Sequence, residues 1–168
     1  EPRETIRDES EDLMSKKQLR SQEQTLPETK KELRKALEAL LESEERYRIL
    51  FSTSPNALFL IGEDGRFLEA NQAALAWYGY SLQEFKQMTV ADLAASRELS
   101  LKAPGTVQRA LQQPTHFEWR HRRKDGRELP VEIDTTPVQV GDKPCTFAIV
   151  RDITERKQAE AALRESES

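Results

Sequence analysis

The hydrophobic residues of segment 25–50 recur at helical spacing and predict an amphipathic helix. Pro27 suits the first turn, because its fixed φ matches a helix and its missing N–H is not needed there. Charged residues fill most other positions, so the apolar residues form a narrow seam along one side of the helix. Such a seam is typical of a two-stranded coiled coil. A single solvated helix packed on its own domain is the alternative. The seam consists of Leu33, Ala36, Leu40, Ser43, Tyr47 and Leu50.

The spacing changes after Pro55, because proline disfavours helical backbone in the residue before it. Residues 57–71 contain two apolar runs separated by an Asp-Gly turn, which is a strong hairpin signal. Several short helices are expected between residues 72 and 113, with Asn71 as the N-cap of the first. A second helix is expected after Ser81, which begins a capping box.

The last third of the chain predicts three strands, at 115–123, 128–138 and 144–152, joined by short turns. The order is therefore helix, two strands, short helices, three strands and a final helix. This order predicts an α+β fold, in which a five-stranded antiparallel sheet carries small helices on one face and helices flank it at both ends.

The last predicted strand runs directly into a charged helix. Asp152 is placed as the N-cap of this exit helix, and Glu155 three residues later predicts a capping box. Losing such a cap costs about 0.5–2 kcal/mol. A shift of the strand would then move or uncap the helix, although a plain helix start is the alternative. The predicted signal-coupling residues are Arg151, Asp152, Ile153, Thr154 and Glu155.

Composition divides the chain unevenly. Residues 1–48 contain 24 charged residues and no glycine, so they cannot bury enough apolar surface to form a globule. The remaining residues have ordinary globular composition. The expected division is a charged, poorly ordered or helical extension (1–26), a coiled-coil helix (27–54), a core domain (55–152) and an exit helix (153–168).

Charge and cysteine content exclude several classes. The net charge of −4 gives no reason to expect a nucleic acid or an acidic membrane as partner. Cys145 is the single cysteine, so no disulfide framework or cysteine zinc site is expected, and a reducing cytoplasm fits. No apolar run approaches the roughly 20 residues of a membrane span. His116 and His121 point to opposite faces of a strand, so no shared metal site is expected.

The two helical ends of the chain resemble each other. Residues 34–45 match residues 157–168 at six identical positions. A common Glu/Ala/Leu helix composition explains part of this match. A tandem array, in which the exit helix of one unit is the entry helix of the next, explains it better.

Several motifs together resemble the PAS sensory domain of bacterial signalling proteins, over about residues 43–157. The resemblance implies a sheet with one face lining a pocket closed by the small helices. The other face would pack on flanking helices and often on a second subunit. The motifs are Asn71, Gly79-Tyr80-Ser81, Lys124-Asp125-Gly126 and Asp152-Ile153-Thr154.

The same resemblance, combined with strand alternation, assigns side chains to the two faces. The residues expected to face inward are Leu58, Leu60, Leu68, Ala70, Trp119, His121, Thr146, Ala148 and Val150. Those expected to face outward are Phe59, Ile61, Cys145, Phe147 and Ile149. The candidate pocket residues are Leu58, Leu60, Ala70, Asn71, Leu75, Trp77, Tyr78, Trp119, His121, Ala148 and Val150.

The sequence lacks the residues that bind haem or react with flavin in cofactor-binding members of the family. Haem-binding members supply an axial histidine before the third strand, but residues 96–113 contain none. LOV-type flavin receptors carry a reactive cysteine in the middle helices, where residues 90–96 contain none. Both cofactors are therefore disfavoured and the ligand is unknown; a flavin without a reactive cysteine, or a small organic molecule, stays open.

The resemblance implies a sensor and homodimerisation module, with no catalysis in this chain. It would relay a ligand or an upstream signal through the exit helix to a C-terminal effector in cis, with a histidine kinase favoured. The alternative is a ligandless dimerisation and spacer module of a cyclic-di-GMP enzyme. The histidine-kinase His box, the cyclase Gly-Gly-Asp-Glu-Phe motif and any nucleotide-binding glycine loop are absent from the sequence.

Overall fold

The computed structural model describes residues 4–167, with side chains described from Leu13 onward, and divides into two units after Arg48. Helix α1 (Glu4–Thr53) crosses this division. It begins upstream of the start expected near residue 27, so Pro27 lies inside the helix instead of in its first turn. The hydroxyls of Thr25 and Thr29 bond to carbonyls one turn back, at 2.9 Å each, on either side of this proline.

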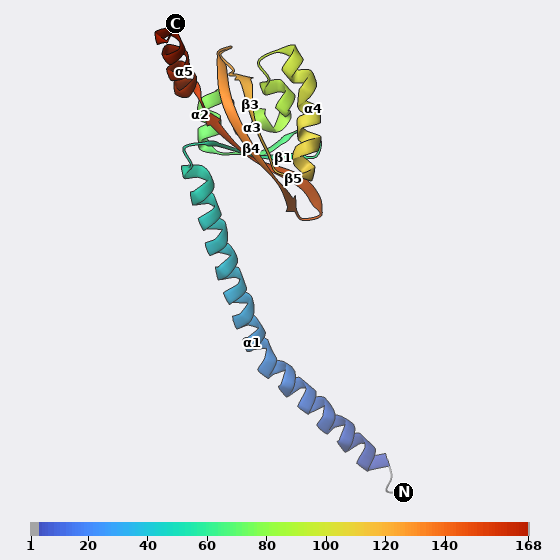
Figure 1. The fold of residues 1–168 in the computed structure, drawn as a ribbon. Helices are drawn as coiled ribbons and strands as arrows, with labels where there is room; N and C mark the ends of the chain where they lie inside the picture. The colour runs from blue at the N-terminus through green and yellow to red at the C-terminus, as the bar shows by residue number, and fades with distance from the viewer. Residues whose placement is uncertain (1–3, 168) are drawn as a thin grey trace. The chain divides into compact units, whose positions relative to one another are not determined.

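The second unit contains the predicted five-stranded antiparallel sheet, in the order β2-β1-β5-β4-β3 (Figure 1). Strand β5 is therefore the central strand, between β1 and β4. The sheet is confirmed in strand number, order along the chain and direction. The strands are β1 (Ala57–Gly62), β2 (Phe67–Ala70), β3 (Thr115–Arg122), β4 (Glu128–Val140) and β5 (Lys143–Asp152).

Short helices fill the connection between β2 and β3 and cover one face of the sheet. Helix α4 packs against β3, β4 and β5 (Figure 1). The predicted capping box is present, since Ser81 and Glu84 exchange hydrogen bonds at the start of α3. The helices are α2 (Gln72–Tyr78), α3 (Leu82–Gln87), the 3-10 helix η1 (Val90–Leu93) and α4 (Arg97–Gln112); α5 (Thr154–Ser166) follows β5.

Asn71 joins the end of α1 to β1 and α2. Its Oδ1 accepts hydrogen bonds from the backbone N–H of Leu58 (2.9 Å) and of Ala74 (3.1 Å), which makes it the N-cap of α2 as expected. Its Nδ2 donates to the carbonyls of Phe51 (3.0 Å) and Asn56 (2.9 Å). Asn71 is 2% exposed, and its four bonds satisfy backbone groups that are buried or partly buried.

Aromatic rings form the centre of the core between the sheet and the short helices. Phe85 contacts Phe59, Phe67 and Tyr78 edge-to-face, with ring centroids 5.2–6.1 Å apart. Such geometry is favoured because the positive edge of one ring meets the negative face of another. These rings fix α3 and α2 over β1 and β2 and so define one end of the space beneath α4.

Candidate functional site

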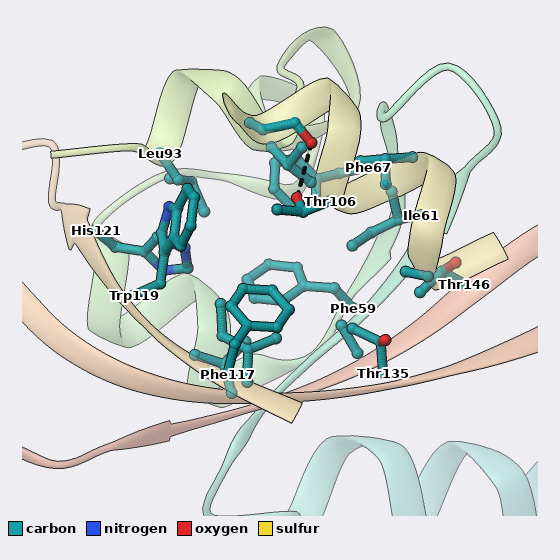
Figure 2. Close-up of a pocket in the computed structure, with 17 residues that line it drawn as sticks. Phe59, Ile61, Phe67, Leu93, Thr106, Phe117, Trp119, His121, Thr135 and Thr146 are labelled. Atoms are coloured by element: carbon teal, nitrogen blue, oxygen red, sulfur yellow. Dashed lines mark hydrogen bonds between the residues drawn. The ribbon is translucent and has the colours of Figure 1, made fainter. Parts of the chain in front are cut away.

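A cavity of about 60 Å³ lies between the sheet and α4 (Figure 2). Its wall on the sheet comes from all five strands, and its roof from η1 and α4. Figure 2 shows His121 and Trp119 at one end, with Thr135 and Thr146 at the other. Its aromatic lining is Phe59, Phe67, Phe117 and Trp119, and its polar lining is Thr106, His121, Thr135 and Thr146.

The prediction that Leu58 and Leu60 face the cavity is wrong. Phe59 is paired with Ala148 and Ile61 with Thr146, and directly paired residues of antiparallel strands share a face. The cavity side chains of β1 are therefore Phe59 and Ile61, which were expected to point outward. The run is apolar at every position, so the alternation that sets the facing of a half-buried strand gives no signal here.

The prediction for β2 is wrong at one residue. A register shift between Leu60 and Ile61 pairs Ile61 with Phe67, so Phe67 lines the cavity. Leu68, which was expected inside, is 38% exposed. A β-bulge of this kind adds one unpaired residue to a strand. The residues beyond it therefore face the side opposite to the one that simple alternation predicts.

Four predicted pocket residues line the cavity, and the others do not. Those that line it are Trp119, His121, Ala148 and Val150, together with the inward-facing Thr146. Ala70, Asn71 and Tyr78 are buried in the core outside the lining. Leu75 and Trp77 pack half-buried against that core, also outside the lining.

The contribution of α4 was missed by the sequence analysis. Its inner face carries small residues and β-branched residues at helical spacing, and these form the roof of the cavity. The spacing is a readable helix signal, but Pro104 within the segment obscures it. The roof residues are Ala103, Thr106, Val107 and Ala110.

The titratable groups at the cavity are uncharged. The Nδ1 atom of His121 lies 2.7 Å from the hydroxyl of Tyr78. Burial lowers the pKa of His121 to about 3, because the protein interior disfavours the imidazolium. Burial likewise raises the pKa of Tyr78 far above its ordinary value. Both groups are therefore neutral near pH 7.

The junction between β5 and α5 differs from the prediction. Asp152 was expected to be the N-cap, but Ile153 occupies that position and the capping box with Glu155 is absent. Thr154 donates its backbone N–H (2.8 Å) and its hydroxyl (2.5 Å) to Asp152 Oδ1. Asp152 is still paired with Val131 in the sheet, which keeps it one residue before the cap position.

The first turn of α5 is fixed to the sheet through its backbone as well. The N–H of Ile153 donates to the carbonyl of Pro130 on β4 (3.1 Å), and the Ile153 side chain is 5% exposed. The carbonyl of Ile153 accepts from the N–H of Lys157 inside the helix (2.9 Å). One buried residue therefore belongs to both the sheet and the exit helix.

Charged side chains connect α5 to the face of the sheet opposite the cavity. Arg156 donates to Glu132 on β4 (3.0 Å) and to Glu118 on β3 (2.9 Å). Lys157 lies 2.7 Å from Glu118, and Arg151 pairs with Asp134. These residues are called the outer charged cluster: Glu118, Glu132, Asp134, Arg151, Arg156 and Lys157.

The outer charged cluster perturbs its own members. The Lys157 ammonium lowers the pKa of the Glu118 carboxyl, with a smaller effect from Arg156. Hydrogen bonds from Arg151 and then His116 lower the pKa of Asp134. The carboxylate of Glu132 raises the pKa of Arg156. Ion pairs between exposed side chains contribute little stability individually, and Glu132, whose side chain is 16% exposed, is the most buried member of the cluster.

His116 lies in this outer region and His121 at the cavity, on opposite faces of β3 as expected. His116 Nδ1 is 2.6 Å from Asp134 Oδ1. Within residues 13–167, no group of three or more His, Cys, Asp or Glu side chains is arranged to hold a metal ion. Cys145 is buried on the strand that carries Thr146.

The predicted dimer seam lies on α1, where its large side chains are exposed. Leu33, Leu40 and Tyr47 are 69%, 64% and 54% exposed, and Leu50 is 67% exposed. Because α1 extends further upstream than expected, the seven-residue spacing continues back through Leu26 and Leu19, which are also exposed. The small seam residue Ala36 is exposed as well. No described helix is long and apolar enough to cross a membrane.

Comparison with known proteins identifies the class of domain. The family model described as "PAS fold" matches residues 51–158. The chain is 31% identical over 130 residues to the methyl sulfide methyltransferase-associated sensor of Methanosarcina acetivorans, covering 77% of this chain and 13% of that protein. It is 28% identical over 130 residues to sporulation kinase E of Bacillus subtilis, covering 77% of this chain and 17% of the kinase.

Solved structures agree with the family match. A domain of a sensory box sensor histidine kinase/response regulator from Geobacter sulfurreducens superimposes with a TM-score of 0.58 and 25% identity, covering 67% of this chain and 96% of that domain. The chain belongs to the PAS family. It is a sensory domain of the kind found in sensor histidine kinases, and it spans less than a fifth of the length of the two curated relatives.

We predict that the pKa of Glu118 reports the docking of α5. In Lys157→Gln the pKa should rise toward the ordinary value of about 4.3, because the largest cause of its depression is removed. Since the folded pKa is depressed, the ion pair contributes above the ordinary value and is lost as pH falls through the folded pKa. Carboxyl ¹³C titration by NMR measures both forms.

Lys86→Gln, a lysine on α3 outside the outer charged cluster, provides the control and should leave Glu118 unchanged. An equal titration curve for Glu118 in wild type and Lys157→Gln would show that the pair does not form in solution.

Proposed function

We propose that this chain is the sensory and dimerisation module of a longer signalling protein. Occupancy of the cavity, or a change in an upstream unit, alters the sheet, and α5 carries that change to a C-terminal effector in cis. The observation that carries the proposal is the position of β5. Its residues Thr146, Ala148 and Val150 line the cavity, and the same strand continues through Asp152 into α5.

The contacts at the junction support a mechanical relay. Arg156 bridges Glu118 and Glu132, which lie on β3 and β4, so α5 is held by two strands besides the one that leads into it. A change in strand spacing would alter this bridge. Signals of this kind typically redistribute states by about 1–3 kcal/mol, a scale that a few hydrogen bonds and ion pairs match.

A histidine kinase is the effector that the comparisons favour. Sporulation kinase E and the sensory box sensor histidine kinase/response regulator from Geobacter sulfurreducens each contain a domain similar to this chain. The alternative, a ligandless dimerisation and spacer module of a cyclic-di-GMP enzyme, has one observation in its favour, namely the small volume of the cavity. The sequence similarity between residues 34–45 and 157–168 supports a tandem arrangement, because residues 34–45 and 157–166 are both helical.

The relay is tested by enlarging a cavity side chain and observing α5. Ala148→Val adds two methyl groups to the cavity wall, and amide resonances from Ala159 to Leu163, beyond the first turn of α5, should shift in ¹H–¹⁵N spectra. In the background Arg156→Gln/Lys157→Gln, the same change should shift them about half as much or less, because coupling between contacting groups is lost.

Arg127→Gln is the matched control, since its guanidinium pairs with Asp125 within the exposed turn between β3 and β4. The proposal fails if Ala148→Val leaves α5 unmoved. It also fails if the double substitution has no greater effect on the α5 shifts than Arg127→Gln.

Homodimerisation through α1 is the second part of the proposal. Leucine or tyrosine recurs every seven residues at Leu19, Leu26, Leu33, Leu40 and Tyr47, the spacing that a left-handed coiled coil buries. A lone helix exposing this many large apolar side chains gains by covering them, at about 25 cal/mol per Å² of apolar surface.

Leu40→Lys should therefore weaken the dimer. Burial of a leucine contributes about 1.5–3 kcal/mol, and 1.4 kcal/mol is tenfold in affinity, so the dissociation constant should rise about tenfold or more. Sedimentation equilibrium on the 168-residue chain measures it. Leu101→Lys is the matched control, because Leu101 is a 73% exposed leucine on α4, outside the seam. A wild-type chain that stays monomeric at every concentration, or an equal effect of Leu101→Lys, contradicts the seam.

A further inference from the structure

Strand β3 lies at one edge of the five-stranded sheet, next to β4 only (Figure 1). Part of this edge is covered, since the N–H of Ala95 donates to the carbonyl of Arg120 (2.9 Å). The backbone of Arg120 therefore points away from β4. Its partner on β4, Pro130, likewise points away from β3, because its carbonyl accepts from the N–H of Ile153. The pair of Arg120 and Pro130 is thus not hydrogen-bonded.

The rest of the β3 edge is open. The direction of the backbone groups alternates along an antiparallel strand, so the N–H and C=O groups of His116 and Glu118 also point away from β4. No hydrogen bond to these groups from outside the sheet occurs among the described residues. The open stretch comprises residues 115–119, between Pro114, which has no N–H, and the covered Arg120. An additional strand can therefore pair with it.

A groove of about 180 Å³ lies beside this open stretch, between β3 and α4. Phe117 and Trp119 line it, with ring centroids 5.6 Å apart, and both rings are only partly buried. Arg109 lines it from the last turn of α4, and its guanidinium has no ion-pair partner among the described residues. The edge therefore combines unpaired backbone groups, partly exposed aromatic rings and an unpaired cation.

The sequence of the open stretch is complementary to itself in one register. In two-fold antiparallel pairing of two β3 strands, one residue lies opposite its own copy. A centre at Glu118 would place two carboxylates opposite each other, which is unfavourable. A centre at Trp119 would place the second strand against the covered Arg120. A centre at Thr115 or His116 would use Pro114, which cannot donate a backbone bond.

A centre at Phe117 avoids all of these conflicts. His116 then lies opposite Glu118 of the second copy, and Glu118 lies opposite His116 of the second copy. Each of these pairs exchanges both of its backbone hydrogen bonds, so the outward N–H and C=O groups of both residues are satisfied. The imidazole of His116 meets a carboxylate on the outer face of the sheet, and this cross-strand pair is attractive.

The groove face is complementary in the same register. Trp119 of the second copy lies opposite Thr115, on the face that carries Arg109. A guanidinium near the face of a tryptophan ring is a favourable cation–π pair, and the two-fold axis makes this contact twice. Phe117 meets Phe117 of the second copy, and aromatic cross-strand pairs are favourable. The unpaired groups of the groove therefore find their partners in a second groove of the same kind.

We propose that the open stretch of β3, residues 115–119, pairs antiparallel with the same stretch of a second copy of this chain, two-fold about Phe117. The pairing is isologous, so it covers both edges at once. Five paired residues form a small interface, and the contact is therefore weak and transient. It uses no residue of the α1 seam, so it does not rest on the dimer proposed above.

NMR of the 168-residue chain at a series of concentrations tests the pairing directly. The chain carries Leu40→Lys, which removes the contribution of the α1 seam. With rising chain concentration, the amides of His116 and Glu118 should shift and exchange with solvent more slowly, because they become hydrogen-bonded. The amide of Phe117 points toward β4, so its exchange rate should not change and provides the internal control.

His116→Pro removes an outward N–H from each copy and leaves the bonds to β4 intact, since that N–H points away from β4. His116→Ala is the matched control, because it loses the same imidazole and keeps the N–H. Relative to His116→Ala, His116→Pro should raise the dissociation constant of the β3 contact about fivefold or more, because two of the four backbone hydrogen bonds are lost. The concentration dependence of the Glu118 amide shift measures both constants.

Disulfide trapping tests the register. Directly opposed residues of a non-hydrogen-bonded pair are close enough for a disulfide, so Phe117→Cys should give a covalent dimer in a glutathione redox buffer. Thr115→Cys lies on the same edge but opposite Trp119 of the second copy, so it should cross-link far less. The native Cys145 is buried and does not compete. Thermal unfolding checks that both variants are folded.

Three results would overturn the proposal. One is an absence of concentration-dependent shifts at His116 and Glu118, or slow exchange there that does not depend on concentration, which would mean that another segment of the same chain covers the edge. The second is an equal effect of His116→Pro and His116→Ala. The third is equal cross-linking of Phe117→Cys and Thr115→Cys. If the shifts occur only without Leu40→Lys, the α1 seam stands and the β3 pairing fails.

Discussion

The antiparallel pairing of β5 with β1 and β4 is the constraint on which the other features depend. The strand is central in the sheet, so its backbone hydrogen bonds are satisfied on both edges. Alternate residues such as Thr146 and Ala148 face the cavity, while Arg151 reaches the outer charged cluster. One strand therefore carries part of the cavity wall, a charged contact on the opposite face and the start of the exit helix.

Two kinds of interaction fix α5, and they differ in strength. The burial of Ile153 and its backbone bond to Pro130 remove apolar surface from water and satisfy a buried amide. Arg156 and Glu118 are 44% and 47% exposed, and exposed ion pairs typically contribute about 0–1 kcal/mol. The buried contact therefore contributes more to fixing the start of α5 than the exposed ion pairs do.

The sequence predicted most of the fold because its local signals agree with each other. The turns, the caps at Asn71 and Ser81 and the alternating strands β3 and β4 each have a clear pattern. The facing of β1 could not be read in this way, since every residue from Ala57 to Ile61 is apolar. Only the pairing with β5, a contact between distant parts of the chain, decides it.

The errors at the candidate site have similar causes. Asp152 has the composition of an N-cap, but its pairing with Val131 keeps it in the strand and moves the cap to Ile153. The hydroxyl of Thr146 has no hydrogen-bond partner among the described residues. This property depends on which groups surround it in the folded chain, so no local sequence pattern predicts it. The number of strands and their order along the chain were thus predictable from local chemistry, whereas the facing of side chains and the exact cap were not.

The central claim is that β5 and the start of α5 open and close as one body. Native-state hydrogen exchange of the Ile153 and Lys157 amides tests it most directly, because the first bonds to Pro130 across the junction and the second to Ile153 within the helix. The account predicts that both share the opening free energy of the β5 amides of Ala148 and Val150. Exchange of Ile153 and Lys157 at rates near those of an unfolded chain, with Ala148 still protected, would contradict it.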